Sequence, residues 1–362
     1  MSVAPSATAE RVQPATRFTL PKSAEATEPP EARGLARDEV RLMVVRGPAP
    51  GRITHTIFRS IAEHLDPGDL IVVNTSATVP AAIDGTRGGD EPVTVHFSGP
   101  AGEDRWIVEL RDKRLGRVGD GVAGERIELP RGVTLTLAQA WPNPRQRSGS
   151  RLWEAEIAVE SSVSSFLEHE GRPITYSHVR GRWPLTDYQT IFGEHPGSAE
   201  MASASRPFSH RVVKDLWKAG VAFAPLVLHT GVSSLEPDEL PLPERYHVPA
   251  ETAHRVNAVR AAGGRVIAAG TTVTRALETV AAPDGSVHAG AGITDVVIGP
   301  DRPPRVVGGL ITGWHEPEAS HLLMLEAIAG PELVGEAYTA ALDPSNGGYL
   351  WHEFGDSCLL FP

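Results

Sequence analysis

The sequence predicts an α/β protein with a smaller all-β domain inserted into it. Two changes of residue pattern carry this prediction. Segments with helical periodicity alternate with short apolar runs from about residue 38 to 73 and again after 159, whereas only short runs of period two occur between about 92 and 159. With 362 residues, of which 41% are hydrophobic, the chain is long enough to bury two well-packed cores.

The first α/β stretch contains two strands and a helix. The segments "EVRLMVV" at 39–45 and "DLIVVN" at 69–74 are expected to be strands, and "HTIFRSIAEHL" at 55–65 is expected to be a helix. Asp66, Pro67, Gly68 and Asp69 form a turn before the second strand. An order of strand, helix and strand is typical of an α/β framework.

The all-β stretch consists of five runs separated by Gly, Pro and Asp clusters, which favours an antiparallel barrel or sandwich. The runs are "VTVHF", "RWIVEL", "ERIEL", "VTLTL" and "LWEAEIAV". We therefore assign residues 80–159 to an inserted domain and residues 31–79 and 160–362 to a discontinuous main domain. Residues 1–30, which are rich in Ala and Pro, are expected to be a flexible lead-in.

Composition excludes several classes of function. The single cysteine, Cys358, excludes an internal disulfide and a multi-cysteine zinc site, so we expect a cytoplasmic protein without a metal. The N-terminal segment lacks the basic start and apolar core of a signal peptide, and no uncharged apolar stretch has membrane-spanning length, so we expect no membrane association. A net charge of -11 repels polyanions, so any nucleic-acid site must rest on a local basic patch.

Three apolar runs without alternation end in polar residues. They are followed by His229, by Thr271 and Thr272, and by His315. Such runs are typical of parallel strands buried on both faces, whose carboxyl ends meet at one edge where ligand sites form. We therefore expect these four side chains to line one cavity. The alternative is that each caps a neighbouring element, as Thr272 would at the start of "VTRALETV".

Six segments across about residues 37–361 resemble the sequence motifs of a known protein family, and they occur in the order of that family and with similar spacing. They are "LDPGDLIVVNTSATVPA" (65–81), "LTDYQTIFGEHPGS" (185–198), "LVLHTGVSSL" (226–235), "RVIAAGTTVTRALE" (265–278), "GGLITGWHEPEASHLLMLEAIAG" (308–330) and "YLWHEFGD" (349–356). They resemble the S-adenosylmethionine:tRNA ribosyltransferase-isomerases of queuosine biosynthesis. The resemblance implies a barrel-like α/β main domain with an inserted small β-barrel.

The resemblance also implies a reaction. The ribosyl group of S-adenosylmethionine, which serves as co-substrate, is transferred to 7-aminomethyl-7-deazaguanine in a tRNA anticodon and isomerised to an epoxycyclopentane, with release of adenine and methionine. The sulfonium acidifies the C5′ hydrogens, so a base must remove one of them, and the departing adenine must be protonated or hydrogen-bonded. The chemistry needs no metal.

Candidate site residues follow from these requirements. His229 and His315 are the candidates for general acid and base because imidazole titrates nearest neutrality. Asp356 either anchors the pocket or caps a turn, and His321 is a weaker candidate because its helix needs a polar face in any case. Arg275 either binds substrate or forms an ion pair with Glu278 on its own helix. The residues expected to bind S-adenosylmethionine or substrate are Thr271, Thr272, Arg275, Gly231, Asn74 and Trp314.

The chain departs from the family pattern in its loops. Where the family typically has arginine, this chain has Ala77, Ala82 and Leu350, and the motif histidine is replaced by Pro207. Other motif positions change in chemical character: family Ala becomes Glu200, Gly becomes Ser233, Leu becomes Glu316 and Ser becomes Glu353. The cores of the strands are retained, which indicates a kept scaffold with a remodelled pocket.

Three hypotheses about function remain open at this level. The first is the tRNA ribosyltransferase-isomerase activity of the family, favoured by the order of the motifs. The second is a paralogue that binds S-adenosylmethionine or a related adenosine compound and acts on a small molecule, favoured by the lost arginines and the charge of -11. The third is a non-catalytic binding protein. Arg180, Arg182 and Arg206 are the candidates for restoring a tRNA contact from other loops.

We predict that tRNA binding is weakened more than binding of S-adenosylmethionine. Phosphate contacts by Lys and Arg supply most non-specific affinity for nucleic acids, and each lost contact lowers the salt dependence by about one unit of slope. The measurement is tRNA affinity at two salt concentrations beside the affinity for S-adenosylmethionine. Tight tRNA binding with a steep salt dependence would contradict this prediction.

Overall fold

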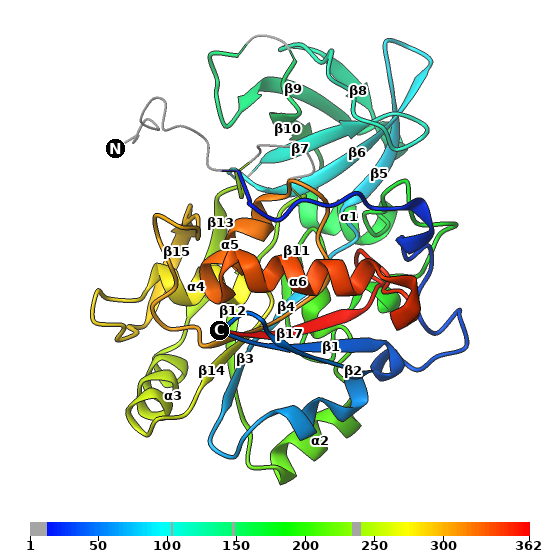
Figure 1. Ribbon diagram of the computed structural model, residues 1–362. Coiled ribbons are helices and arrows are strands. Elements are labelled where there is room, and N and C mark those ends of the chain that lie inside the picture. Colours follow the sequence, from blue (N-terminus) through cyan, green and yellow to red (C-terminus); the bar gives the residue numbers. More distant parts are fainter. Residues whose placement is uncertain (1–12, 103, 147–148, 234–239) are drawn as a thin grey trace.

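The computed structural model describes residues 13–102, 104–146, 149–233 and 240–362. A nine-stranded mixed sheet forms the main domain, and a closed six-stranded barrel lies at one end of it (Figure 1). A two-stranded sheet of β4 (Ser76–Thr78) and β11 (His195–Ser198) lies between these parts of the chain. The fold class predicted from the sequence, an α/β main domain with an inserted small β-barrel, is confirmed.

The centre of the large sheet consists of parallel strands. Strand β3 pairs in parallel with β12 and with β14, and β14 pairs in parallel with β16. The carboxyl ends of these four strands therefore meet at one edge. The full order is β15 (Gly290–Thr294), β13 (Glu244–Val248), β12 (Ala222–His229), β3 (Leu70–Asn74), β14 (Val266–Ala269), β16 (Gly309–Thr312), β17 (Ser357–Phe361), β1 (Arg41–Arg46) and β2 (Arg52–Ile57).

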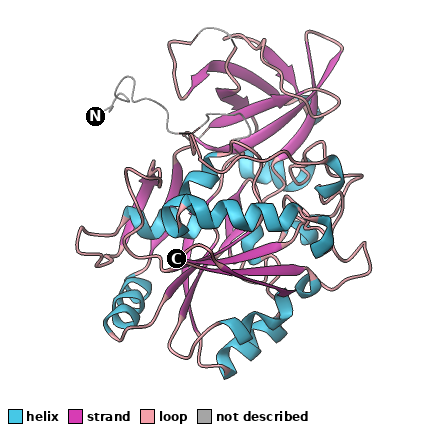
Figure 2. Ribbon diagram, in the orientation of Figure 1, coloured by secondary structure: helices cyan, strands magenta, loops and turns pink. Residues whose placement is uncertain are grey.

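Both faces of this sheet are covered (Figure 2). On one face, Val72, Ala268 and Leu310 pack with helices α3 (Ala250–Ala261), α4 (Thr271–Thr279), α5 (Ser320–Ala329) and α6 (Pro331–Leu342). On the other, Ile267 and Ile311 pack with α2 (His210–Lys218) and a 3-10 helix at Phe58–His64. Burial on both faces explains why these strands lack an alternating pattern.

The inserted barrel has its own core of aliphatic and aromatic side chains, among them Val95, Leu110, Leu137 and Trp153. Helix α1 (Val163–Glu170) follows the barrel, and its Phe166 packs against the same core. The short strand β5 was not anticipated from the sequence. The barrel strands are β5 (Ala82–Arg87), β6 (Glu91–Pro100), β7 (Arg105–Arg111), β8 (Arg126–Glu128), β9 (Thr134–Trp141) and β10 (Leu152–Ala158).

Two local expectations need correction. The helix expected at 55–65 is a 3-10 helix that spans only Phe58–His64, whereas residues 55–57 end β2, because residues 52–57 pair in register with β1. The described part of the lead-in, from residue 13, is packed on the main domain: the Thr16 amide donates to Glu326 Oε1 at 2.7 Å and Phe18 contacts Tyr338. Residues 1–12 lie outside the described residues. In the part of the chain that is described, no helix is long and apolar enough to cross a membrane.

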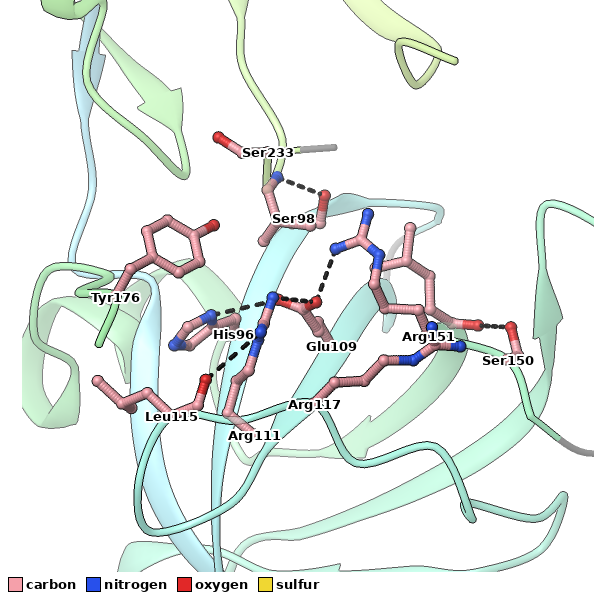
Figure 3. Close-up of polar contacts among 12 residues, drawn as sticks. His96, Ser98, Glu109, Arg111, Leu115, Arg117, Ser150, Arg151, Tyr176 and Ser233 are labelled. Atoms are coloured by element: carbon pink, nitrogen blue, oxygen red, sulfur yellow. Dashed lines mark hydrogen bonds and ion pairs between the residues drawn. The ribbon is translucent and has the colours of Figure 1, made fainter. Parts of the chain in front are cut away.

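A buried charge cluster lies on strands β6 and β7 (Figure 3). His96 and Glu109 point away from Val95 and Leu110 of the barrel core, as expected from the alternation of side chains along a strand. Glu109 is fully buried and accepts hydrogen bonds from Arg111 and Arg151, each at 2.6 Å. Its Oε2 lies 3.4 Å from His96 Nδ1. Burial alone would raise the pKa of Glu109, but His96, Arg151 and Arg111 outweigh burial and lower the pKa to about 2.

We predict that Glu109→Gln lowers the free energy of unfolding by about 3 kcal/mol or more, because it removes the buried negative charge that accepts hydrogen bonds from the Arg111 and Arg151 guanidinium groups. The matched control is Glu156→Gln, which removes an ion pair with Arg105 whose side chains are 52% and 55% exposed, and which should cost less than about 1 kcal/mol. Urea unfolding at pH 7 measures both. Equal stabilities of the two variants would contradict the proposed importance of the cluster.

Candidate active site

A cavity of about 240 Å³ lies where the parallel strands end. Its lining includes the residues that follow β14 and β16, namely 270–272 and 313–316, and the turn at 230–233 that follows β12. Segments 174–178 and 199–204 and residues 352–353 form the remaining walls. Segments that are distant in the sequence thus converge on one enclosed volume, as is usual at the carboxyl edge of a parallel sheet.

Thr271 and Thr272 enter the cavity at the start of helix α4. Gly270 precedes them with φ +107°, a backbone conformation that favours glycine, and allows the chain to turn directly from β14 into the helix. No side chain caps this helix. Its first amide groups and the two threonine hydroxyls therefore form a set of donors for oxygen atoms of a ligand.

His315 is held on a rigid aromatic platform. Its backbone amide donates to Tyr338 Oη at 3.2 Å, and Trp351 Nε1 donates to its carbonyl at 2.9 Å. The neighbouring Trp314 is 3% exposed and packs against the rings of Tyr338 and Trp351, with centroid distances of 5.1 and 5.4 Å. These contacts fix the backbone of His315 before any ligand binds.

The imidazole of His315 is neutral at physiological pH. Burial lowers its pKa well below the usual value, and the nearby His321 and His352 lower it further. His315 Nε2 lies 2.8 Å from Thr312 Oγ1, and its ring stacks on His321 with a centroid distance of 4.6 Å and an angle of 3°. Burial also lowers the pKa of His321 to about 4. A neutral imidazole in this position is available to accept a proton.

Three aromatic rings form a second wall of the cavity. The Tyr176 and His178 rings lie 6.3 Å apart at 21°, and the His178 and His352 rings are stacked 3.9 Å apart at 20°. Each ring has a carboxyl partner. Tyr176 Oη hydrogen-bonds Glu200, His178 Nε2 lies 2.8 Å from Glu353, and His352 Nδ1 lies 3.6 Å from Glu316. We call these six residues the acidic wall.

The carboxyl groups of the acidic wall differ in charge state. Burial raises the pKa of Glu200 to about 7, although Ser233 and Tyr176 donate hydrogen bonds to it. Burial also raises the pKa of Glu316. For Glu353, burial acts in the same direction, but the hydrogen bond from His178 and the effects of His178 and His352 together outweigh it and lower the pKa. Burial lowers the pKa of His178, but the hydrogen bond to Glu353 and the charges of Glu353, Glu316 and Glu25 together outweigh it and raise the pKa.

Three residues expected at the site lie outside the cavity lining, so the shared-cavity expectation was wrong for His229. His229 Nδ1 lies 2.8 Å from Ser76 Oγ. Asn74 is fully buried. Its side chain forms hydrogen bonds with the amide and the carbonyl of Leu228 and so connects β3 to β12. Asp356 accepts from the amides of Arg41 and Leu350 at 2.7 and 2.8 Å, which is the turn-capping alternative considered for it.

Other expected residues border the cavity in structural roles. Arg275 lines it, but the guanidinium is saturated by Glu244 and by the carbonyls of Leu242, Thr294 and Val296. Its partner is therefore Glu244 and not Glu278. Gly231 also lines the cavity, and a Cβ there would lie 2.5 Å from Ser98 Oγ of the barrel.

The three arginines proposed for tRNA contact have different environments. Arg206 is 2% exposed and bonds Glu31 and the Asp187 carbonyl, so it is not free to meet a phosphate. Arg182 is exposed and pairs with Asp84 at 3.1 Å. Arg180 is also exposed and lies on the same loop. Arg206 is therefore too buried to replace a lost tRNA contact. Arg180 and Arg182 lie on an accessible loop.

Sequence reasoning missed most of the acidic wall. Glu200, Glu316 and Glu353 stood out only as departures from the family pattern, and His321 was undervalued as part of a polar helix face. Tyr176, His178 and His352 gave no local signal, because stacking depends on three loops that meet only in the folded chain. Among the described residues, no three His, Cys, Asp or Glu side chains are grouped so as to hold a metal ion.

A cavity at the carboxyl edge of a parallel sheet defines an α/β protein with the architecture of an enzyme. The family is shown by comparison with known proteins: the chain belongs to the queuosine biosynthesis protein family, whose model matches residues 15–360.

Relatives of the chain match it over nearly its full length. It is 34% identical to the S-adenosylmethionine:tRNA ribosyltransferase-isomerase of Symbiobacterium thermophilum over 355 residues, or 95% of this chain and 98% of that protein. It is 32% identical to the protein of the same name from Moorella thermoacetica, again over 95% and 98% of the two chains. The crystal structure of an S-adenosylmethionine tRNA ribosyltransferase from Thermotoga maritima is similar with a TM-score of 0.51 and 26% identity, covering 95% of this chain and 99% of that one.

We predict that the free energy of unfolding of Glu200→Gln, measured relative to wild type, increases by about 2 kcal/mol as the pH rises from 5 to 8. The pKa of Glu200 is raised from 4.5 to about 7, so between these values the folded protein retains a proton that the unfolded chain loses. Wild-type stability from this group is thus present at low pH and is lost as the pH rises, whereas glutamine does not titrate.

The measurement is chemical unfolding at pH 5 and pH 8 for wild type, Glu200→Gln and the control Glu318→Gln, whose carboxyl is half exposed and pairs with Arg17. A stability difference between Glu200→Gln and wild type that does not change with pH would show that Glu200 titrates normally.

Proposed function

We propose that the protein is an S-adenosylmethionine-dependent ribosyltransferase-isomerase that transfers and isomerises the ribosyl group onto 7-aminomethyl-7-deazaguanine in tRNA, releasing adenine and methionine. The observation that carries this proposal is the convergence of Thr271, Thr272 and His315, all from segments that resemble the family, on one cavity. The names of relatives that match 95% of the chain support it. We place the enzyme in the cytoplasm, where both substrates occur.

The first chemical step requires a base near C5′ of the ribose. His315 is the candidate because its neutral imidazole lies on the cavity and its backbone is fixed by Tyr338 and Trp351. Thr271 and Thr272 supply hydroxyl groups beside the uncapped amides of α4, which suits the oxygens of a ribose or of a methionine carboxylate. Holding the ribose rigidly is essential, since a proton transfer depends on the distance between base and carbon.

The departing adenine requires a proton donor or a hydrogen bond. His178 is the candidate, because Glu353 favours its protonated form and it lines the same cavity. The pKa of His315 is lowered by burial and that of His178 is raised by a carboxylate partner, so the pKa values of two imidazoles in one cavity are shifted in opposite directions. This separation is what acid and base catalysis in a single site requires.

A second candidate function is the transfer of the ribosyl group to a small molecule. The observation that favours it is the position of the departures from the family pattern: Glu200, Ser233, Glu316 and Glu353 all line the cavity. In addition, Ala77 and Ala82, which replace family arginines, are buried. Adenine release that needs a free acceptor but not tRNA would distinguish this function from the first.

The experiment that tests the proposed function is release of adenine from S-adenosylmethionine, measured by chromatography with and without tRNA that carries the precursor base. We predict that His315→Gln lowers the rate at least about 100-fold, because removal of a positioned base usually costs two to four orders of magnitude. His210→Gln, on the exposed start of α2, is the matched control and should leave the rate near that of wild type. No adenine release by wild type with this tRNA would falsify the proposed activity.

A further inference from the structure

The acidic wall carries more negative charge than its own residues balance. Glu353 is paired with His178 at 2.8 Å and raises the pKa of that imidazole. Among the described residues, Glu200 accepts hydrogen bonds from uncharged donors, the hydroxyl of Tyr176 and the amide and hydroxyl of Ser233. Across the described ranges, no Lys or Arg nitrogen lies within 4.0 Å of the carboxyl oxygens of Glu200 or Glu316. Two carboxyl groups of the cavity therefore have no Lys or Arg partner in the described part of the chain.

Among the described residues, two imidazoles act near Glu316: His352, whose pKa burial lowers to about 4, and His178, which lowers the pKa of Glu316 but is already hydrogen-bonded to Glu353. Glu353 acts on Glu200 and Glu316 in the same direction as burial and raises the pKa of each. Arg111, whose guanidinium lies 5.5 Å from the Tyr176 ring, is already bound to Glu109. A buried carboxyl group without a counter-charge is costly, and a cationic ligand would relieve that cost.

A second observation also indicates a ligand at this wall. The side chain of His352 lines the cavity and is 9% exposed, yet its Nε2 has no hydrogen-bond partner in the described chain. Buried polar atoms without partners are rare and cost about 1–3 kcal/mol each, so a polar ligand at this wall would satisfy a need that the protein leaves open.

Residues that match the family pattern and residues that depart from it lie in different parts of the cavity. The segment with Thr271, Thr272 and Arg275 and the residue His315 resemble the family, and they lie at the sheet edge. The wall with Glu200, Glu316 and Glu353 has carboxyl groups where the family pattern has uncharged residues.

We propose that the acidic wall binds the positively charged alkylammonium group of the acceptor substrate. This inference rests on the proposed ribosyl transfer and specifies how this chain recognises the group that accepts the ribosyl unit. Glu200 and Glu316 supply the negative charge, and Tyr176, Ser233 and His178 hold the carboxyl groups in place. The amino group of S-adenosylmethionine is a second source of the same chemistry, and the experiment separates the two.

The test compares two free bases by isothermal titration calorimetry at pH 7: 7-aminomethyl-7-deazaguanine and 7-methyl-7-deazaguanine, which differ in the ammonium group. Wild type is expected to bind the amine about tenfold more tightly, because charge-assisted hydrogen bonds are roughly twice as strong as neutral ones. Since the pKa of Glu200 is about 7, binding of a cation should also release up to about half a proton, measured by titration in buffers of different ionisation enthalpy.

The variants are Glu200→Gln, Glu316→Gln and the control Glu318→Gln, which lies two residues from Glu316 but outside the cavity lining. The first two should reduce the preference for the amine to threefold or less, and Glu200→Gln should abolish the proton release, while the control keeps both. A circular dichroism melt of each variant verifies folding, and the double variant Glu200→Asp with Glu316→Asp should retain part of the preference.

The same titrations with S-adenosylmethionine and with methylthioadenosine, which lacks the amino acid, identify the source of the ammonium group. If the wall variants weaken S-adenosylmethionine and leave the free bases unchanged, the proposed acceptor site is wrong. Equal affinity of wild type for the two free bases, or no binding of either at millimolar concentration, also overturns it. Adenine release by wild type with precursor tRNA is measured separately, so the acceptor site can fail while the proposed function stands.

Discussion

The parallel pairing of β3 with its neighbours is the constraint on which the rest of the structure depends. Because β3, β14 and β16 are buried on both faces, their polar continuations can lie only at the ends of the sheet. The chain leaves β14 through Gly270, whose positive φ brings Thr271 directly to the edge. It leaves β16 through Gly313 and Trp314 to reach His315. The position of the cavity thus follows from the topology of the sheet.

The inserted barrel has a second role besides enclosing its own core. The outer face of β6 and β7 carries His96, Glu109 and Arg111, and this cluster packs behind Tyr176, which faces it with an edge-on contact of 5.9 Å to the His96 ring. Tyr176 in turn bonds Glu200 in the cavity. Ser98 of the barrel accepts a hydrogen bond from the amide of Val232, in the turn that lines the cavity. The barrel therefore positions one wall of the site from behind.

Burial gives chemically similar residues of this cavity different charge states. His315, His321 and His352 have lowered pKa values, whereas His178 has a raised pKa because Glu353 lies beside it. Among the carboxyl groups, the pKa of Glu353 is lowered, which favours its ionised form, whereas burial raises the pKa of Glu200. One cavity thus contains imidazole and carboxyl groups whose pKa values are shifted in opposite directions.

The sequence by itself determined the order of the α/β and all-β parts, because the hydrophobic period differs between helices and strands and is a local property. It also determined that Thr271, Thr272 and His315 follow buried strands, and the resemblance of six segments identified the family. It did not determine that residues 55–57 end a strand, because pairing with β1 overrides local periodicity. The role of His229 was equally undetermined, since its hydrogen bond to Ser76 depends on a contact across 153 positions of the chain.

Only the tertiary structure decided which residues form the site. Tyr176, Glu200 and Ser233 are spread over three loops, and His178 and His352 are separated by more than half of the main domain, yet they share one wall. Their pKa values depend on burial and on neighbours that are remote in the sequence. The physical reason is that a cavity is a property of packed surfaces, whereas a sequence pattern reports only the local preferences of the chain that forms them.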